Sequence, residues 1–372
     1  METADIVIAG AGFAGATTAY RLAKRGVKNI FLLEPEAVPG FHASGRNASL
    51  TFQLLSDPQE ARLALEGTQF IATPPNDFCG IPLLRRSGSL LLAERNGISA
   101  LEKSYETAQV LGLHCEILPA DRAMNMVPPL ADARFELALW NPNDGVVDVK
   151  RLLQCFLDGA RLCGVVLEYE RTITAVQVER GRIVGVETNQ GPIATRMLVN
   201  AGGAWAGEIG RMAGVGARTL APRRRHMYQL QVGFPTDPSW PFAWHNDLDV
   251  YFRPEGTGLL CSPCDATPHP PLDPQVDPAV EPVFRDKLHR AFPALVHAHV
   301  TKSWACLRTF ARDERFVIGR DPEIEGFVWV AALGGHGVTT SPAVGRLGAA
   351  AVLGERLPEL DYFSPGRLTL TQ

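Results

Sequence analysis

The sequence predicts an α/β protein whose N-terminal part is a β-α-β unit, and three observations support this fold class. The apolar run at 5–9 is typical of a buried parallel strand. Residues 14–25 have the apolar spacing and the basic last turn of a helix. A second apolar run at 29–33 predicts the next parallel strand, which ends at Glu34. The three elements follow one another with short connections, as a β-α-β unit requires.

The loop between the first strand and the helix has the pattern G-x-G-x-x-G. Gly10 allows a tight turn, Gly12 allows the backbone to approach a pyrophosphate, and Gly15 allows the helix to pack closely on the strand. The N–H groups of the helix start can bind phosphates, and Glu34 can accept hydrogen bonds from a ribose. The unit therefore predicts dinucleotide binding. The expected cofactor-binding residues are Gly10, Gly12, Phe13, Ala14, Gly15 and Glu34.

Composition limits the other classes of protein. The chain has 372 residues, enough for two domains, and its net charge of −4 gives no reason to expect a nucleic-acid partner. No run of 18 apolar residues occurs, and the N-terminus lacks the basic start of a signal peptide. Seven cysteines without regular spacing fit a reducing compartment. We therefore expect a cytoplasmic protein without a transmembrane segment.

Two of the cysteines, Cys261 and Cys264, have the C-x-x-C spacing of a zinc ligand pair. No second pair accompanies them, so we expect two loop thiols rather than a zinc site. We expect no metal site elsewhere.

The middle of the chain begins with an amphipathic pattern that predicts a helix over 151–163. Runs at 165–169, 173–178 and 183–188 then alternate or stay apolar, and a polar turn separates the last two. These three runs predict a β-meander.

Small residues follow buried strands at two later places. A strand that starts at residue 197 breaks into a run of small residues that ends at Trp205. The strand predicted at 327–331 leads into glycines at 334–337 and then into a helix over 342–353. Such segments allow a backbone to approach a large flat group, and a helix start can hold its electron-rich atoms. Residues 235–282, rich in Pro, Asp and Trp, predict strands and long loops around a pocket.

The choice between NAD and FAD depends on these later segments. Only one complete fingerprint occurs, whereas an FAD enzyme that also used NAD(P) would usually need a second. A plain NAD dehydrogenase would not need the distant glycine-rich segment at 334–337. The sequence therefore favours FAD.

Five ordered motifs carry a resemblance that covers nearly the whole chain. They are the GAGFAG unit with Glu34, ASGRNA at 43–48, the run 198–205, WACLRT at 304–309 with Asp313 and FVIG at 316–319, and the tail GGHGVTTSPAVG. In these motifs the chain resembles the D-amino-acid-oxidase-like family of FAD-dependent oxidoreductases. The most similar subgroup is that of D-arginine dehydrogenases, next to glycine and sarcosine oxidases.

The resemblance implies a Rossmann-like FAD-binding domain of the glutathione-reductase type, with an inserted, mostly antiparallel β-sheet substrate domain of α+β type. It implies that residues 1–75, 146–215 and 305–372 form the FAD-binding domain, and that 76–145 and 216–304 form the substrate domain.

The resemblance also implies cofactor-binding residues beyond the first loop. Ser44, Arg46 and Asn47 are expected at the pyrophosphate and the edge of the isoalloxazine, and His336 among the residues at its pyrimidine end. The remaining residues expected at the cofactor are Ala201, Gly202, Trp205, Gly335, Gly337, Val338 and Thr339.

For the substrate, the resemblance implies that Arg308 binds an α-carboxylate, helped by Tyr251, with His336 nearby. A surface role for Arg308 and simple strand packing for Tyr251 remain as alternatives. In the run Arg223 to His226 one side chain can point into the pocket, and the sequence does not decide which.

The family chemistry implies hydride transfer from an amino acid, with a D-amino acid favoured, to FAD. The imine then hydrolyses to a keto acid and ammonia, and oxygen or a quinone takes the electrons. Two departures from the family matter. Leu50 and Phe52 stand near places where the D-arginine subgroup has histidine and tyrosine, so a D-arginine preference is not carried over. Cys306 is a candidate for a thioether to the flavin, against a buried inert thiol.

Three alternatives stay open. A 2-hydroxy-acid dehydrogenase would need a base, for which His42 and His336 are the candidates. A sarcosine- or glycine-type amine oxidase would use the same carboxylate site. An FAD-holding subunit without activity would lose the substrate groups, and the joint presence of Arg308 and Tyr251 speaks against it.

Overall fold

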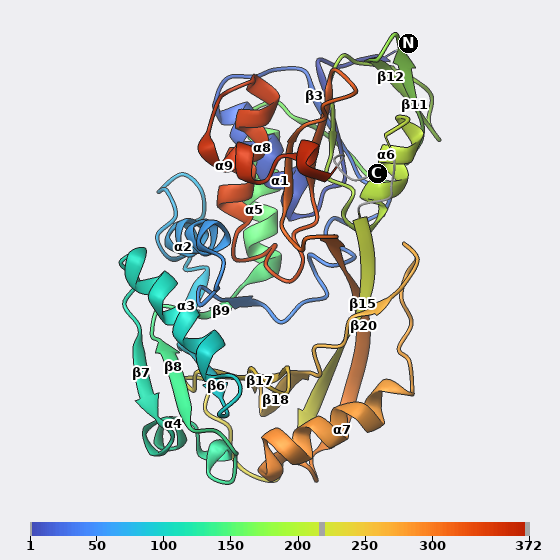
Figure 1. Cartoon of the computed structure of the whole chain (residues 1–372). Coiled ribbons are helices and arrows are strands. Elements are labelled where there is room, and N and C mark those ends of the chain that lie inside the picture. The colour runs from blue at the N-terminus through green and yellow to red at the C-terminus, as the bar shows by residue number, and fades with distance from the viewer. Residues whose placement is uncertain (1, 216–219, 369–372) are drawn as a thin grey trace.

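The structure is a computed structural model that describes residues 2–215 and 220–368. One half of the molecule is built on a six-stranded sheet with the order β10-β3-β2-β14-β22-β21 (Figure 1). All its neighbouring strands are parallel except β21 and β22. The strands are β2 (Ile6–Ala9), β3 (Ile30–Leu33), β10 (Val166–Glu168), β14 (Leu198–Asn200), β21 (Val317–Arg320) and β22 (Phe327–Ala331).

Both faces of this sheet are covered, which gives three layers. Ile6 and Ile8 of β2 pack in a core with helices α1 (Phe13–Lys24), α5 (Val149–Leu162) and α8 (Ser341–Leu353). Val7 and Ala9 point to the other face because successive side chains of a strand alternate. There they meet helix α6 (Ala206–Met212) and a four-stranded sheet, β1 (Glu2–Thr3), β13 (Ile193–Ala194), β12 (Arg182–Thr188) and β11 (Ile173–Glu179).

The N-terminal β-α-β unit, the helix before residue 163 and the C-terminal strand and helix lie within about two residues of the predicted bounds. The predicted β-meander over 165–188 is wrong in its first strand. Residues 166–168 pair in parallel with β3 at the edge of the six-stranded sheet, and only β11 and β12 form an antiparallel pair. Helix α5 packs against α1 on the face of that sheet, so the strand that follows it returns to the same sheet.

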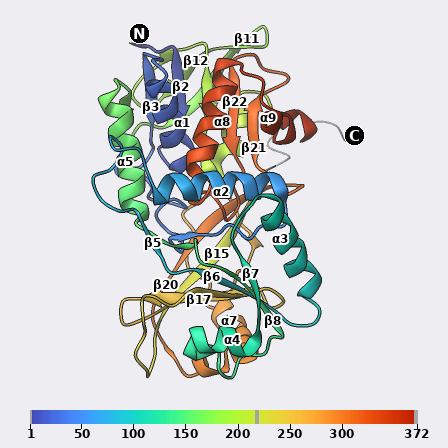
Figure 2. The ribbon, with the colours of Figure 1, turned by 90° about the vertical axis from the view of Figure 1, so that its left-hand side faces the viewer.

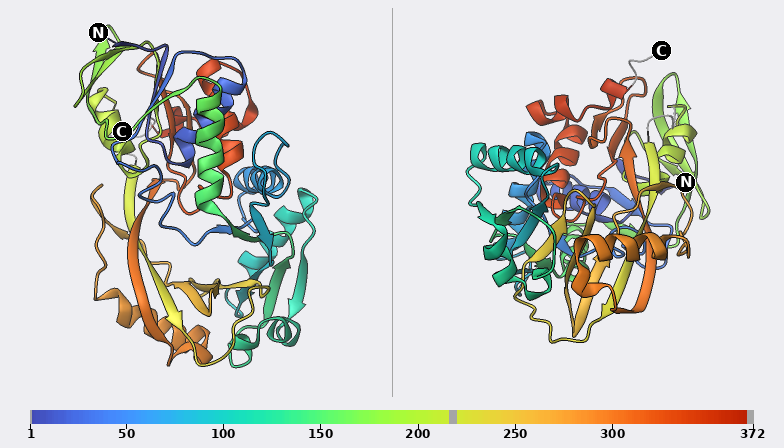
Figure 3. Two further views of the ribbon diagram at one scale, coloured as in Figure 1. Left: turned by 180° about the vertical axis from the view of Figure 1, so that it is seen from behind. Right: turned by 60° about the horizontal axis from the view of Figure 1, so that its bottom comes forward.

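The other half contains a nine-stranded, mostly antiparallel sheet with the order β19-β15-β18-β17-β16-β6-β8-β7, in which β20 pairs with β15. Helix α7 (Val280–Ala291) lies across the face of the sheet seen from below in Figure 3, and α4 (Ala120–Met126) packs in the same core. The strands are β6 (Ser89–Ala93), β7 (Glu116–Pro119), β8 (Leu137–Asn141), β15 (Leu220–Gln231), β16 (Phe242–His245), β17 (Val250–Glu255), β18 (Gly258–Ser262), β19 (Thr267–Pro268) and β20 (His299–Ala311).

Helix α2 (Pro58–Ala72) lies between the two halves and crosses the ends of the helices above it in Figure 2. It contacts α8 on one side and α3 (Ile98–Val110) on the other. A three-stranded sheet lies nearby, and short helices complete the fold. These are β4 (Leu50–Thr51), β5 (Leu84–Arg86) and β9 (Gly145–Val147), helix α9 (Pro358–Tyr362), and the 3-10 turns Pro128–Leu130, Gly203–Trp205, Pro293–Leu295 and Pro365–Leu368.

The long strands β15 and β20 run side by side from one half into the other (Figure 1). The division into an FAD-binding and a substrate domain stays a proposal. The boundary predicted at 304/305 falls inside β20, a continuous strand of the nine-stranded sheet, so it does not coincide with a linker.

Two further sequence expectations concern cysteines and the membrane. Cys261 lies in β18 rather than in a loop and is fully buried, and Cys264, just after the strand, is also buried. Among the helices of residues 2–215 and 220–368, none is long and apolar enough to cross a membrane.

Candidate functional site

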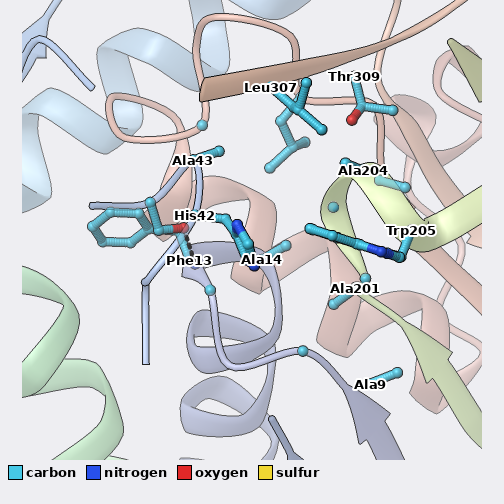
Figure 4. Close-up of a pocket in the computed structure, with 18 of the residues that line it drawn as sticks. Ala9, Phe13, Ala14, His42, Ala43, Ala201, Ala204, Trp205, Leu307 and Thr309 are labelled. Atoms are coloured by element: carbon cyan, nitrogen blue, oxygen red, sulfur yellow. Dashed lines mark hydrogen bonds between the residues drawn. The ribbon is translucent and has the colours of Figure 1, made fainter. Parts of the chain in front are cut away.

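A cavity of about 410 Å³ opens at the carboxyl ends of β2, β3, β14 and β22. Ligands of open parallel sheets bind at this edge because the loops there converge. Figure 4 shows Ala9, Ala201 and Trp205 around it. Fourteen of the residues predicted at the cofactor line it: Gly10, Gly12, Phe13, Ala14, Glu34, Ser44, Arg46, Asn47, Ala201, Gly202, Trp205, Gly335, Gly337 and Val338.

Two hydrogen bonds fix the first loop and the start of α1 at the cavity wall. The backbone N–H of Ala11 donates to Glu34 Oε2 at 2.8 Å, and that of Phe13 donates to Ser44 Oγ at 3.0 Å. Burial raises the pKa of Glu34, although backbone N–H groups, including that of Glu36, oppose the rise. Glu34 therefore fixes the loop and keeps lone pairs toward the cavity, where a ribose can be bound.

Gly15 does not line the cavity. A Cβ on this residue would lie 1.9 Å from the carbonyl oxygen of Gly10. Its role is thus the one expected of the third glycine, close packing of helix and strand.

The segment 43–48 is held by its own polar groups. Asn47 donates to the carbonyl of Ser44 at 2.8 Å and accepts from the N–H of Ser49 at 2.8 Å. Arg46 forms an ion pair with Asp273 at 2.5 Å and lies over the ring of Phe41, 4.5 Å from its centroid. These contacts shape one wall of the cavity and position Arg46 at its rim.

His42, one candidate base, lies beside Trp205, with 4.5 Å between ring centroids (Figure 4). Its Nε2 is 2.8 Å from Glu36 Oε1. His42 is thus held on the side of the cavity that contains Glu34 and Glu36, the side where an adenosine is expected.

The other end of the cavity is formed by β20 and the C-terminal glycine segment. Cys306 to Thr309 and residues 330–335 line it. Thr339, predicted at the cofactor, is outside: its Oγ1 accepts from the N–H of Phe52 at 3.1 Å and donates to the carbonyl of Leu50 at 3.3 Å. Cys306 is buried, and its thiol lies 3.5 Å from the carbonyl of Arg225. A thioether from Cys306 stays a prediction.

The predicted substrate residues gather beyond this end. Tyr251 is buried and His336 half-buried, and the charges of Arg225 and Arg308 act on both. Burial and, to a smaller extent, the charges of Arg225 and Arg308 together lower the pKa of His336 to about 4. Burial raises the pKa of Tyr251, and among the described residues its hydroxyl donates to the sulfur of Met227 alone, at 3.5 Å.

The structure distinguishes the side chains of the 223–226 run. Arg223 pairs with a glutamate at 3.0 Å, Arg224 pairs with an aspartate at 2.5 Å, and His226 Nδ1 is 2.7 Å from another aspartate. Arg225 donates through Nε to the carbonyl of Asp265 at 2.8 Å. Within the described part of the chain, neither Arg225 nor Arg308 has an acidic partner in an ion pair. Sequence alone did not single out Arg225, because strand alternation says which residues share a face and not which face is the pocket.

Sequence reasoning also missed residues 171–173 and Pro274, which line the cavity. The first group follows β10, and a correct assignment of β10 to the six-stranded sheet would have placed it at the cavity edge. Pro274 belongs to a long loop and carries no signal of its own.

The residues present fit a dinucleotide such as FAD. The cavity combines a helix start, a buried carboxylate and glycine backbone, and a Cβ at Gly12 would approach Ser44 Oγ to 2.9 Å. Among residues 2–215 and 220–368, no group of three or more His, Cys, Asp or Glu side chains could hold a metal ion.

The chain is similar to several known proteins. The human mitochondrial dimethylglycine dehydrogenase is 24% identical over 399 residues, and the mouse mitochondrial pyruvate dehydrogenase phosphatase regulatory subunit is 25% identical over 366 residues. These alignments cover 100% and 92% of this chain but only 45% and 40% of those proteins, so the chain spans less than half the length of either relative.

The structure of L-proline dehydrogenase from P. horikoshii superposes with a TM-score of 0.88 at 23% identity, over 99% of this chain and 98% of that one. The family described as FAD dependent oxidoreductase, DAO, matches residues 5–351. Since this match covers most of its length, the chain belongs to the DAO family of FAD-dependent oxidoreductases.

Proposed function

We propose that the protein oxidises a small amino acid at its carbon–nitrogen bond with FAD, and that the substrate is a D-amino acid. The observation that carries the proposal is the pair Arg225 and Arg308, which form no ion pair with an acidic side chain in the described part of the chain, although the charges of Asp249 and Asp265 act on Arg225 from a distance. Burying a cation without a counter-ion is costly, so such a pair calls for an anionic ligand. Arg308 also lines the cavity, next to the place expected for the flavin ring.

A carboxylate is the anion that this site suits best. The planar guanidinium of Arg308 can offer two parallel N–H groups, which fix orientation as well as adding energy. In the part of the chain that the structure describes, the acceptor of the Tyr251 hydroxyl is a sulfur, which is a weak acceptor, so this hydroxyl can donate to a carboxylate instead. Held in this way, the α-carbon of the substrate would be oriented toward the glycine segment 334–337.

The amine has to lose its proton before oxidation. The positive charges that lower the pKa of His336 also disfavour an ammonium group nearby, so the bound amine is shifted toward its neutral form. FAD supplies the chemistry as the acceptor of a hydride from the substrate α-carbon. The imine is then hydrolysed by water to a keto acid and ammonia, and the electrons pass on to oxygen or a quinone.

The 2-hydroxy-acid alternative is less well supported. A pKa of about 4 makes His336 a weak base, and His42 is engaged by Glu36 and Trp205. Full turnover by His42→Ala and His336→Ala variants would argue against this alternative.

A second candidate is the oxidation of an N-alkylated amino acid. The similarity to dimethylglycine dehydrogenase over the whole of this chain favours it, and the carboxylate site would serve both kinds of substrate. The similarity to a phosphatase regulatory subunit keeps an FAD-holding role without activity as the alternative to both.

The test is an anaerobic visible spectrum of the purified protein with bound FAD. D-amino acids, L-amino acids, N-methyl amino acids and 2-hydroxy acids are added separately, and bleaching of the flavin band reports hydride transfer. We expect bleaching by D-amino acids, and the rate of recovery in air separates an oxidase from a dehydrogenase. Bleaching by N-methyl or L-amino acids alone would replace the D-amino acid by that class. Bleaching by none of the four would favour the inactive FAD-holding role.

A further inference from the structure

Arg225, one of the two cations of the proposed carboxylate site, lies on the cavity face of strands β15 and β20. In the register of this antiparallel pair, Arg225 is opposite Cys306 and Arg223 is opposite Arg308. Opposite residues of such a pair carry their side chains on the same face, and so do alternate residues of one strand. Cys306 and Arg308 line the cavity. The register thus places the side chain of Arg225 on the face that bears these two cavity residues.

The other edge of β15 has a gap in its strand pairing beside Arg225. Strand β18 pairs with β15 at 228–230, and β19 pairs with it at 223–224. Asp265, in the connection from β18 to β19, occupies the gap. Its Oδ1 accepts from the backbone N–H of His226 at 2.8 Å, and its carbonyl oxygen accepts from Arg225 Nε at 2.8 Å. One residue thus holds both the backbone of the strand and the guanidinium of Arg225.

The imidazole of His226 holds the second carboxylate oxygen of Asp265. His226 Nδ1 is 2.7 Å from Asp265 Oδ2, and His226 Nε2 accepts from the backbone N–H of Asp277 at 2.9 Å. Because a backbone N–H can only donate, Nε2 carries no proton, and the ring proton is on Nδ1. Nδ1 therefore donates to the carboxylate of Asp265. The ring of His226 is fully buried, which strengthens both bonds.

The guanidinium of Arg225 keeps its two terminal nitrogens for a ligand. Within residues 2–215 and 220–368, this side chain donates from Nε alone. The bond from Nε sets the plane and direction of the fork, so Nη1 and Nη2 can offer N–H groups to an anion. Asp265 stays ionised, because the hydrogen bonds from His226 and the charge of Arg225 hold its pKa below the usual value although burial opposes this.

We propose that Asp265 is a positioning residue for the substrate carboxylate, which it orients through the guanidinium of Arg225. The inference rests on the proposed function, because that function assigns Arg225 to the carboxylate. Asp265 does not line the cavity and acts only through Arg225.

The substitution that tests this role is Asp265→Asn. The side-chain amide can still accept from the N–H of His226, but its NH2 group then faces the Nδ1–H group of the ring. A shift of the ring proton to Nε2 would only move the clash to the N–H of Asp277. The amide cannot satisfy all three donors, so the carbonyl that holds Arg225 has to move.

Charge and position predict opposite results for this variant. Removing a negative charge beside Arg225 would by itself strengthen the binding of an anion, whereas losing the orientation of the guanidinium weakens it. The experiment titrates propionate, a carboxylate without an amine, into the oxidised protein with FAD bound and follows the shift of the flavin absorption band. We expect Asp265→Asn to raise the Kd of propionate by about tenfold, as the loss of a hydrogen bond to a charged group does.

A double variant shows whether Asp265 acts through Arg225. Arg225→Ala alone should raise the Kd of propionate by about 30-fold, and adding Asp265→Asn should raise it by less than about twofold more. The control is Asp277→Asn, which removes the carboxylate paired with Arg224 at 2.5 Å but keeps the N–H that donates to His226. Its Kd should stay within about twofold of the unmodified value.

Two variants of His226 test the same bond without changing Asp265. His226→Leu removes the donor to the carboxylate, whereas the side-chain amide of His226→Asn can still supply one. We expect His226→Leu to raise the Kd of propionate by about tenfold and His226→Asn by only about two- to threefold. The flavin absorption of each purified variant reports how much FAD it holds.

Failure of this inference and failure of the proposed function give different results. If propionate does not perturb the flavin of the unmodified protein, or if Arg225→Ala leaves the Kd unchanged, Arg225 does not bind the carboxylate and both are wrong. If Arg225→Ala weakens binding while Asp265→Asn leaves it unchanged or strengthens it, the inference alone is overturned. Equal losses in His226→Leu and His226→Asn would overturn it as well, and so would a full tenfold loss from Asp265→Asn in the protein that already carries Arg225→Ala.

Discussion

At the scale of single residues, the side chain that most directly tests the proposed chemistry is Arg308. Arg308→Ala removes the planar fork offered to the carboxylate, so the rate of flavin reduction at low substrate should fall by about 100-fold, roughly 3 kcal/mol. The measurement is stopped-flow bleaching of the flavin band.

The matched control for that variant is Arg223→Ala. Arg223 lies directly opposite Arg308 in the β15–β20 register but is paired with Glu314. Its loss should change the reduction rate by less than about threefold, as expected for an exposed ion pair. Equal losses in both variants, with FAD still bound, would contradict a carboxylate role for Arg308.

A second residue, Glu60, predicts a pH dependence of stability. Burial and, to a smaller extent, the neighbouring Asp57 together raise its pKa to about 7. Between its ordinary value of 4.5 and about 7 the folded state binds the proton more tightly than the unfolded state, so this group lowers the free energy of unfolding as the pH rises through that window.

Glu60→Gln should therefore raise the free energy of unfolding at pH 8 by about 1–2 kcal/mol, and the gain should disappear at pH 4.5. Urea unfolding at the two pH values measures it. The control is Glu102→Gln, an exposed glutamate of α3, which should give no pH-dependent gain. An equal gain for Glu60→Gln at both pH values would contradict the assignment.

At the scale of elements, the packing of α2 depends on one glycine. A Cβ at Gly67 would lie 1.9 Å from the carbonyl oxygen of Thr339, and that atom is backbone, so it cannot turn away. Gly67→Ala improves the intrinsic helix propensity by about 1 kcal/mol, yet it has to push α2 off the segment next to the cavity.

We expect Gly67→Ala to lower the free energy of unfolding by roughly 1–3 kcal/mol and to weaken FAD binding, because Val338 lines the cavity next to Thr339. Denaturant unfolding and flavin titration measure the two effects. Gln69→Ala, on the exposed face of the same helix, should leave both within about 0.5 kcal/mol. A neutral or stabilising Gly67→Ala would show that the helix shifts at little cost.

The elements also show what sequence can predict. The β-α-β unit and the C-terminal strand and helix were predictable because glycine spacing and unbroken apolar runs are local signals. The parallel pairing of β10 with β3 was not predictable. The sequence of a three-residue strand does not distinguish a strand of a meander from a strand at the edge of a parallel sheet. The side chain of the 223–226 run that points toward the pocket was not predictable either, since strand alternation shows which residues share a face of β15 but not which face lies toward the pocket.

At the scale of the whole molecule, the two halves are joined over the cavity by the segment 265–279. Its base is fixed to β15, where His226 Nε2 accepts from the N–H of Asp277 at 2.9 Å. At its tip, Asp273 pairs with Arg46 on the cavity wall, and the next residue, Pro274, lines the cavity. A bound dinucleotide would thus be enclosed partly by a segment of the other half, and this contact would slow its release.

Asp273→Asn removes the charge of this pair without touching a residue of the cavity lining, which Arg46→Ala would not achieve. An exposed ion pair contributes up to about 1 kcal/mol, so FAD should leave the Asp273→Asn protein about two- to fivefold faster at low ionic strength. Near 1 M salt the difference should vanish, because screening already weakens the pair in the unmodified protein. Recovery of flavin fluorescence after dilution measures the rate.

Asp286→Asn, which breaks an exposed pair with Arg290 on α7, is the control and should release FAD at the unmodified rate. If Asp273→Asn also does so at low salt, segment 265–279 covers the cavity without restraining its ligand, and release must be limited by contacts within the six-stranded half alone.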